Sequence, residues 1–270
     1  MDTSRAQPPL AWEPLTPRGV AAFACASLRR LLLVQLFVAV LATATLVWFL
    51  ATAWFPTITT AIERLPRTGE IRSGRLVWRG DSPRTLAENR FLALTVDLRH
   101  DASARSSAHI QAEFGESDLR IFSLLGFLPA NYPRGWIIAF NRVDLQPWWG
   151  AWAPEILAVA GGIAIAGLMM SWCLLAVIYC PVVWLIGFFA NRELTLGGSW
   201  RVAGAALLPG AVFMTLSIFL YGLGALDLVR LLSAAALHLV IGWVYLVASP
   251  LWLPRHPETP LVKNPFRTRS

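Results

Sequence analysis

The longest apolar region of the chain, residues 153–254, constrains the fold more than any other feature. Three uncharged segments follow one another within it, at 156–191, 202–226 and 231–254. Because roughly 20 apolar helical residues cross the ~30 Å hydrocarbon core of a bilayer, each segment is long enough to span a membrane. A soluble core does not need three such segments in succession. The sequence therefore predicts an integral membrane protein.

Composition and charge agree with this class. Only 14% of the residues are charged, whereas soluble domains carry roughly 25%. The net charge is +7, but the basic excess sits beside the hydrophobic segments and forms no basic face, which argues against a nucleic-acid partner. Cys25, Cys173 and Cys180 all lie outside the polar segment at 56–152, so no disulfide framework or CxxC motif is predicted.

Four membrane-spanning helices are predicted. The first, at 31–55, has Gln35 as its strongly polar side chain and is too long for the core of a cleavable signal peptide, so we expect a retained anchor. Pro181 is expected to separate the second span from an interfacial, kinked or re-entrant segment at 181–189, and Pro209 with Gly210 to kink the third. The predicted parts are the flank 1–30, the span 31–55, an outer domain 56–152, a three-helix membrane domain 153–254 with spans at 156–179, 202–224 and 231–253, and a tail 255–270.

Basic residues predict the orientation. The N-terminal flank holds four Lys or Arg residues, the 191–201 loop two and the tail four, whereas the 225–230 turn holds one. Because basic flanks stay in the cytoplasm, both termini are expected there. The outer domain and the 225–230 turn then face outward. We expect a multi-pass protein of the bacterial inner (cytoplasmic) membrane.

The polar segment at 56–152 is typical of a small, mainly antiparallel β domain. Alternation over residues 91–98 places Leu92, Leu94, Val96 and Leu98 on one buried strand face. Further strands are expected at 71–78, 109–114, 119–124 and 136–141, after a helical extension of the first span at 57–65. Trp148, Trp149 and Trp152 mark the return to the membrane, where tryptophan favours the headgroup boundary. The predicted fold is thus a mainly α-helical membrane protein with a small β-rich extracytoplasmic domain between helices 1 and 2.

Candidate sites are few. His238 lies inside the last span, where ionisable residues are functional candidates, although a neutral histidine can also hydrogen-bond a neighbouring helix. Gly161, Gly162 and Gly167 would let another helix approach closely.

In the outer domain, acidic residues and histidines either bind a divalent metal or are solvated polar side chains. These residues are Asp97, His100, Asp101, His109 and Glu113. His109 and Glu113 share one strand face, whereas Asp97 and His100 point to opposite faces if their strand continues. The chain contains no Walker loop, GxSxG, HExxH or dinucleotide fingerprint, so no catalytic, cofactor-binding or metal-binding residue is predicted.

The layout resembles the uncharacterised bacterial DUF1189 family, some of whose members are labelled maltodextrin-utilisation proteins and whose C-terminal helices are compared with Yip-type membrane proteins. The matching features are a glycine-led strand pair at 69–76, a strand ending in Val96-Asp97, and a polar loop at 192–194 that precedes the span with Pro209. The resemblance implies one N-terminal span, an outer β-rich insert and three C-terminal helices. It implies no catalytic residues.

These observations favour a non-enzymatic membrane protein whose outer domain senses, binds or scaffolds something. The alternative is a small accessory subunit of a membrane transport or assembly complex, which the small-residue run around Gly161 would fit. The expected partners are the lipid bilayer and either another membrane protein or a second copy of the chain.

Overall fold

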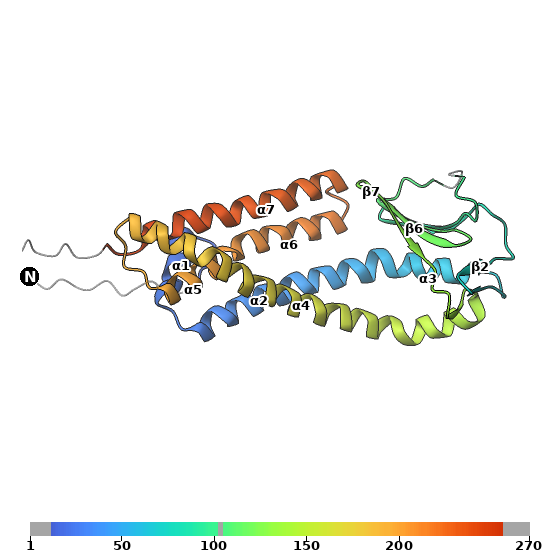
Figure 1. The fold of residues 1–270 in the computed structure, drawn as a ribbon, viewed down its shortest axis with the longest axis horizontal. Coiled ribbons are helices and arrows are strands. Elements are labelled where there is room, and N and C mark those ends of the chain that lie inside the picture. The colour runs from blue at the N-terminus through green and yellow to red at the C-terminus, as the bar shows by residue number, and fades with distance from the viewer. Residues whose placement is uncertain (1–11, 102–104, 256–270) are drawn as a thin grey trace, which may run out of the picture. The chain divides into compact units, whose positions relative to one another are not determined.

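The computed structural model describes residues 12–101 and 105–255 (Figure 1). This part is mostly helical and contains four helices that are long and apolar enough to cross a membrane. They are Leu28–Glu63, Arg142–Phe189, Leu196–Gly222 and Leu228–Trp252. This agrees with the four predicted spans. The predicted flank 1–30 and tail 255–270 lie partly outside the described residues.

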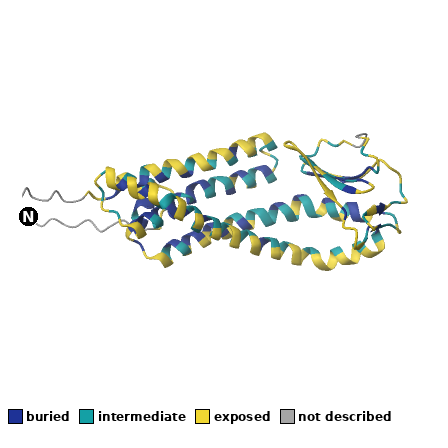
Figure 2. Cartoon of the chain, viewed as in Figure 1, coloured by how far each residue is buried: buried dark blue, intermediate teal, exposed yellow. Residues whose placement is uncertain are grey.

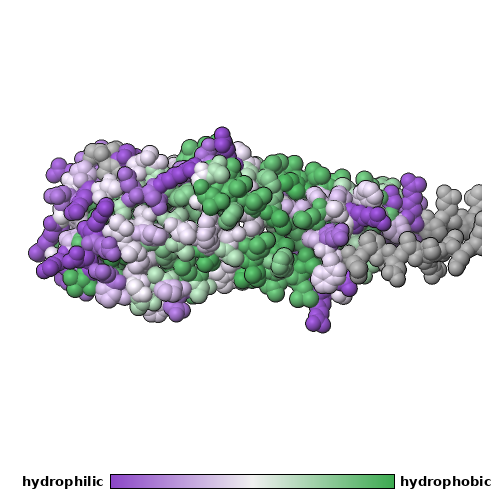
Figure 3. All heavy atoms as spheres, turned by 180° about the vertical axis from the view of Figure 1, so that it is seen from behind, coloured by the Kyte–Doolittle hydropathy of each residue, from purple (hydrophilic) through white to green (hydrophobic). Residues whose placement is uncertain are grey.

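The chain divides into two compact units. The first comprises Met1–Ala42, Ala164–Ser217 and Val229–Ser270, and the second comprises Thr43–Ile163 and Ile218–Leu228. Hydrophobic side chains cover the long helices on the face drawn in Figure 3, whereas hydrophilic side chains gather over the strands. Many of the helical residues are nevertheless exposed (Figure 2), as expected where lipid rather than protein covers an apolar surface.

The N-terminal segment packs into the first unit. It forms α1 (Pro17–Ala22) and a 3-10 turn, η1 (Phe23–Cys25). The sequence of residues 19–30 is compatible with an unstructured basic flank or with an interfacial helix that turns Val20 and Phe23 to lipid, but both side chains are fully buried. The guanidinium of Arg201 helps to hold the segment there, because its Nη2 donates to the Ala24 carbonyl at 2.6 Å and its Nε to the Phe23 carbonyl at 3.3 Å. These bonds tie the segment to α5 (Leu196–Ala206).

Prolines have different effects in three of the long helices. After α2 (Leu28–Phe49), the turn η2 (Leu50–Trp54) is π-helical and leads into α3 (Phe55–Glu63), which begins around Pro56. The third span breaks at Leu207 between α5 and α6 (Leu208–Gly222), where Pro209 cannot donate to the Ala205 carbonyl. The kink predicted there is thus a break.

By contrast, α4 (Arg142–Phe189) continues as one helix through Pro181. The segment expected to be interfacial, kinked or re-entrant at 181–189 is therefore helical. A proline inside a helix removes one backbone hydrogen bond, and the rest of this long apolar helix keeps its own. The last long helix is α7 (Leu228–Ala248), followed by the 3-10 turn η3 (Ser249–Trp252).

Two sheets lie in the second unit. The smaller has the order β2-β1-β8 and the larger the order β3-β4-β5-β6-β7. The strands are β1 (Glu70–Arg72), β2 (Arg75–Val77), β3 (Arg84–Glu88), β4 (Leu92–Val96), β5 (Ile110–Phe114), β6 (Asp118–Ser123), β7 (Gly126–Asn131) and β8 (Ile137–Ala139).

The strand positions differ in part from those predicted. The strand expected at 71–78 from its residue pattern is a hairpin, which agrees with the strand pair at 69–76, because Ser73 and Gly74 take positive φ values of 52° and 77° and turn the chain. Strands β3 and β7 were not predicted. Pairing is mainly antiparallel, as expected, except that β4 and β5 run parallel. The long connection between β4 and β5 permits this, since parallel strands need a crossover.

Strand β4 is buried on both faces rather than one. Leu94 and Val96 pack with an apolar cluster that includes Phe140 and Ala61 of α3. Thr95 on the opposite face is also fully buried and accepts a hydrogen bond from Gln111 Nε2 at 3.1 Å. The second face is therefore covered, and its interior is polar.

Candidate functional site

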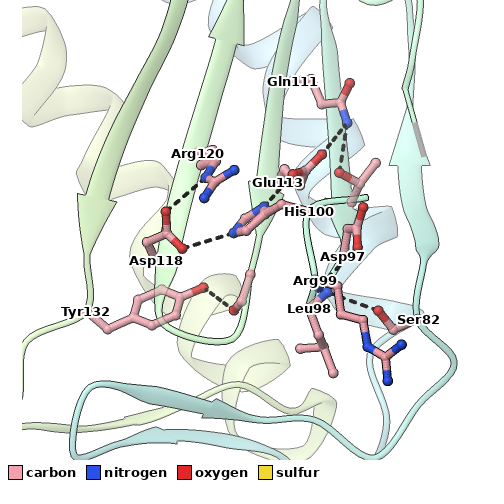
Figure 4. A network of polar contacts seen from close by, with 12 residues as sticks. Ser82, Asp97, Leu98, Arg99, His100, Gln111, Glu113, Asp118, Arg120 and Tyr132 are labelled. Atoms are coloured by element: carbon pink, nitrogen blue, oxygen red, sulfur yellow. Dashed lines mark hydrogen bonds and ion pairs between the residues drawn. The ribbon is translucent and has the colours of Figure 1, made fainter. Parts of the chain in front are cut away.

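The polar face of the larger sheet gathers charged side chains around one histidine (Figure 4). Strand β5 contributes Glu113 and β6 contributes Asp118, while His100 comes from the connection after β4. His100 reaches them because β4 ends at Val96 and His100 itself has a positive φ of 55°, which turns the chain back. The expectation that Asp97 and His100 point to opposite faces assumed a continuing strand, and the strand does not continue.

His100 lies between two carboxylates. Its Nδ1 is 2.5 Å from Glu113 Oε1, and its Nε2 is 2.9 Å from Asp118 Oδ1. The side chains of His100 and Glu113 are 10% and 1% exposed. When both carboxylates are ionised, both ring nitrogens must donate, and only the imidazolium form has two N–H groups. The geometry therefore favours a buried cation between two anions.

The neighbouring groups complete the cluster. Arg120 Nε donates to Asp118 Oδ2 at 3.0 Å. Burial raises the pKa of Asp118, but the hydrogen bonds and positive charges of His100 and Arg120 outweigh burial and hold it below its usual value of 3.8. Because this pKa is lowered by folding, the carboxylate contributes stability that is full above pH 3.8 and is lost as the pH falls from there through the lowered pKa. Tyr132 donates to the Gly115 carbonyl at 3.1 Å, and burial raises the pKa of its hydroxyl.

This cluster does not form a metal site. Among the described residues, no three His, Cys, Asp or Glu side chains are arranged to hold a metal ion. The structure brings Asp97, His100 and Glu113 together but places His109 elsewhere. Asp97 Oδ1 accepts from the Arg99 amide at 3.3 Å, while its buried Oδ2 meets no partner in the described chain. The bonds of His100 to Glu113 and Asp118 therefore hold residues 97–101 on the sheet.

A second group of residues joins the sheet to the end of α6 inside the second unit. The ring of His109 stacks on Tyr221, and its Nδ1 lies 2.6 Å from the Tyr221 hydroxyl. Phe91 packs edge-on against both Tyr221 and Phe49, with ring centroids 5.0 and 5.2 Å apart. We call Phe49, Arg90, Phe91, His109 and Tyr221 the junction.

Arg90 adds charged hydrogen bonds to the junction. Its Nη1 donates to the Gly224 carbonyl at 2.7 Å and its Nη2 to the Leu226 carbonyl at 2.9 Å. These carbonyls follow the C-terminus of α6, where a positive charge is favourable. One guanidinium therefore binds two carbonyls of the α6–α7 turn.

Asn89 positions these side chains. Its Oδ1 accepts from the amides of Phe91 and Leu92 at 2.8 and 2.9 Å, which fixes the turn before β4. Its Nδ2 donates to the Ala53 carbonyl at 2.5 Å in the π-helical turn η2. A π-helical turn leaves helix carbonyls available to other donors, and Asn89 uses one. The local sequence thus holds Arg90 and Phe91 against the helices.

The remaining residues predicted from the sequence include His238 in α7 and three glycines in α4. The His238 ring bonds the Ala235 carbonyl of its own helix. A Cβ at Gly161 would lie 3.4 Å from Val47 Cγ2, whereas one at Gly162 or Gly167 would meet nothing within 4 Å.

Among the three tryptophans, Trp149 donates to Thr59 Oγ1 at 2.9 Å and stacks on Phe55. Trp148 and Trp152 are about half exposed, at 49% and 52%. Sequence reasoning missed the close approach of α6 and α7 in the first unit, where a Cβ at Gly210 would collide with the His238 carbonyl.

No family model, curated protein or solved structure matches the chain. Function is therefore inferred from the geometry of the chain's own residues.

Replacing His100 tests the buried cluster. His100→Leu would leave Glu113 and Asp118 buried without their cation, which we expect to cost about 3–5 kcal/mol of unfolding free energy. Arg75→Gln is the control, because it removes only the exposed 3.3 Å ion pair with Glu116 and should cost about 1 kcal/mol or less. Thermal unfolding of the detergent-solubilised variants measures both. Equal destabilisation would contradict a stabilising role for the cluster.

The pH dependence of the junction provides a second test. Burial lowers the pKa of His109 below its usual 6.5, and Arg90 lowers it further, against a smaller opposing effect of Asp227. Between the folded and unfolded pKa values the unfolded protein binds more protons, so this contribution to stability is full above pH 6.5 and weakens as the pH falls below it. The melting temperature of the wild-type protein should fall more between about pH 7.5 and about pH 5.5 than that of the His109→Gln variant. Identical losses would exclude His109 as the titrating group.

Proposed function

We propose that this is a non-enzymatic, multi-pass protein of the bacterial inner membrane whose outer β region senses or binds a partner and passes its state to the helices. The four apolar helices support membrane insertion. The basic flanks support cytoplasmic termini, with residues 56–152 and the 225–230 turn outside.

The junction carries this proposal. A β region that served only as an inert cap would not need specific hydrogen bonds to a helix turn. Arg90, just before β4, and His109, just before β5, both contact the segment 221–226. A shift of this sheet end, caused by a bound partner, would therefore act directly on the end of α6. Such a mechanism needs two arrangements of the turn with different affinity for the partner.

Substituting Arg90 tests the coupling. Arg90→Gln removes two charge-assisted hydrogen bonds, and the loss of only one, worth about 1.5 kcal/mol, would accelerate amide hydrogen exchange about tenfold, so exchange in residues 218–228 should accelerate by at least about tenfold. Arg79→Gln is the matched control, since Arg79 is also exposed and has no ion pair among the described residues. Equal exchange in both variants and wild type would show that the β region does not restrain the turn.

The second candidate is a small accessory subunit of a membrane transport or assembly complex. The open space at Gly162 and Gly167 favours it, because a helix from another protein or a second copy could pack closely there. Gly162→Leu should then abolish copurification of a stoichiometric partner in mild detergent, while Gly161→Ala, at a position already in contact with Val47, serves as the control within the chain. An unchanged Gly162→Leu complex, or a wild-type protein without a partner, would remove this candidate.

A further inference from the structure

The turn between β6 and β7 is apolar and exposed. From Leu124 to Ala130 the chain carries no charged side chain. Leu124 and Leu125 at the tip are 57% and 85% exposed, and Phe127 and Leu128 of β7 are 58% and 66% exposed. Such side chains gathered on one hairpin are costly in water and indicate a surface that something apolar covers. We call residues 124–128 the hairpin tip.

Strand register places the hairpin tip at one end of the sheet. Ile110 at the start of β5 pairs with Ser123 at the end of β6, and Ser123 pairs with Gly126 at the start of β7. The hairpin tip therefore lies at the end of the sheet where β4 and β5 begin. His109, which precedes Ile110, bonds Tyr221 of α6. The hairpin tip therefore lies at the sheet end that contacts the end of an apolar helix.

The opposite end of the same strands has the reverse character. There the β5–β6 turn contains Gly115, Glu116 and Ser117, and both Glu116 and Ser117 are exposed. The sheet is thus polar at one end and apolar at the other, and its apolar end is the one that contacts the end of α6. This polarity matches that of a bilayer surface rather than that of water.

Arginines beside the hairpin tip favour lipid over a protein partner. The Arg105 guanidinium lies 4.0 Å from the Phe122 ring centroid and is the main basic group here; that of Arg120 lies 5.8 Å from the Phe127 ring but is also paired with Asp118. Arginine at the edge of an apolar surface can bury its stem and keep its charge among anionic headgroups. Apolar tips rimmed by basic groups are typical of interfacial membrane binding.

We infer that the hairpin tip inserts into the outer headgroup layer of the bilayer that the helices span, with Leu124 and Leu125 as its deepest residues. This inference rests on the proposed membrane placement. The sheet end at the junction would then be held both by its contacts with the α6–α7 turn and by lipid. A change at the lipid surface would act on the same sheet end.

Spin-label accessibility tests this directly in the full chain. The native thiols are replaced as Cys25→Ser, Cys173→Ala and Cys180→Ala, and one nitroxide is attached at Leu125→Cys, Ser117→Cys or Ile163→Cys. The proteins are reconstituted in phosphatidylcholine vesicles with a quarter of phosphatidylglycerol, and collisions with oxygen and with a water-soluble nickel chelate are compared. Ile163 is 68% exposed on α4 and reports the bilayer, and Ser117 reports water.

The oxygen-to-nickel collision ratio at residue 125 should exceed that at residue 117 by at least about threefold, because oxygen concentrates in lipid. A ratio equal to that at residue 117 would overturn the inference. Protection from both reagents would overturn it too, because it would show that protein covers the tip. If residue 163 reports lipid while residue 125 reports water, only the tip inference fails. If residue 163 reports water, the membrane placement and the inference that rests on it both fail.

Discussion

A bilayer core supplies no hydrogen-bond partners, so a segment that crosses it must satisfy its own backbone groups. This constraint explains how the chain distributes its secondary structure. All described strands fall between residues 70 and 139, and the long apolar segments on both sides are helical. An open sheet with an exposed edge strand such as β7 is tolerated in water or at a headgroup layer but not in hydrocarbon. The one strongly polar side chain of the first span, Gln35, is fully buried and donates to the Gly204 carbonyl at 3.3 Å.

The apolar helices could be predicted from the sequence because length and hydropathy alone identify them. Strands depend on partners distant in the chain, and their prediction was less complete. Strand β7 was not predicted because it contains Gly126 and Pro129, which are rare in central strands but tolerated at an edge. Strand β3 was not predicted because its residues 84–88 include two charged side chains and only two adjacent apolar residues.

The polar interior was predicted least well, for a related reason. Thr95 and Gln111 look like solvent-facing residues in an alternating strand, yet both are buried, and Gln111 Oε1 accepts a hydrogen bond from the Ser106 amide in the β4–β5 connection. Neither alternation nor spacing reveals which loop folds over a sheet. The candidate set contained His100 and Glu113 but missed Asp118 and Arg120, and the left-handed backbone of His100 decided which side chains met. Arg90 and Tyr221 are 131 positions apart, and no local pattern links them.

The proposed function requires the β region to lie outside the membrane and the termini inside, and cysteine accessibility tests this most directly. Two proteins are compared in intact cells, one with native Cys25 as its only thiol and one with Ser117→Cys as its only thiol; both residues are exposed in the structure. A membrane-impermeant maleimide should label residue 117 in intact cells and Cys25 only after the membrane is permeabilised. Labelling of Cys25 in intact cells, or protection of residue 117 until permeabilisation, would contradict the account.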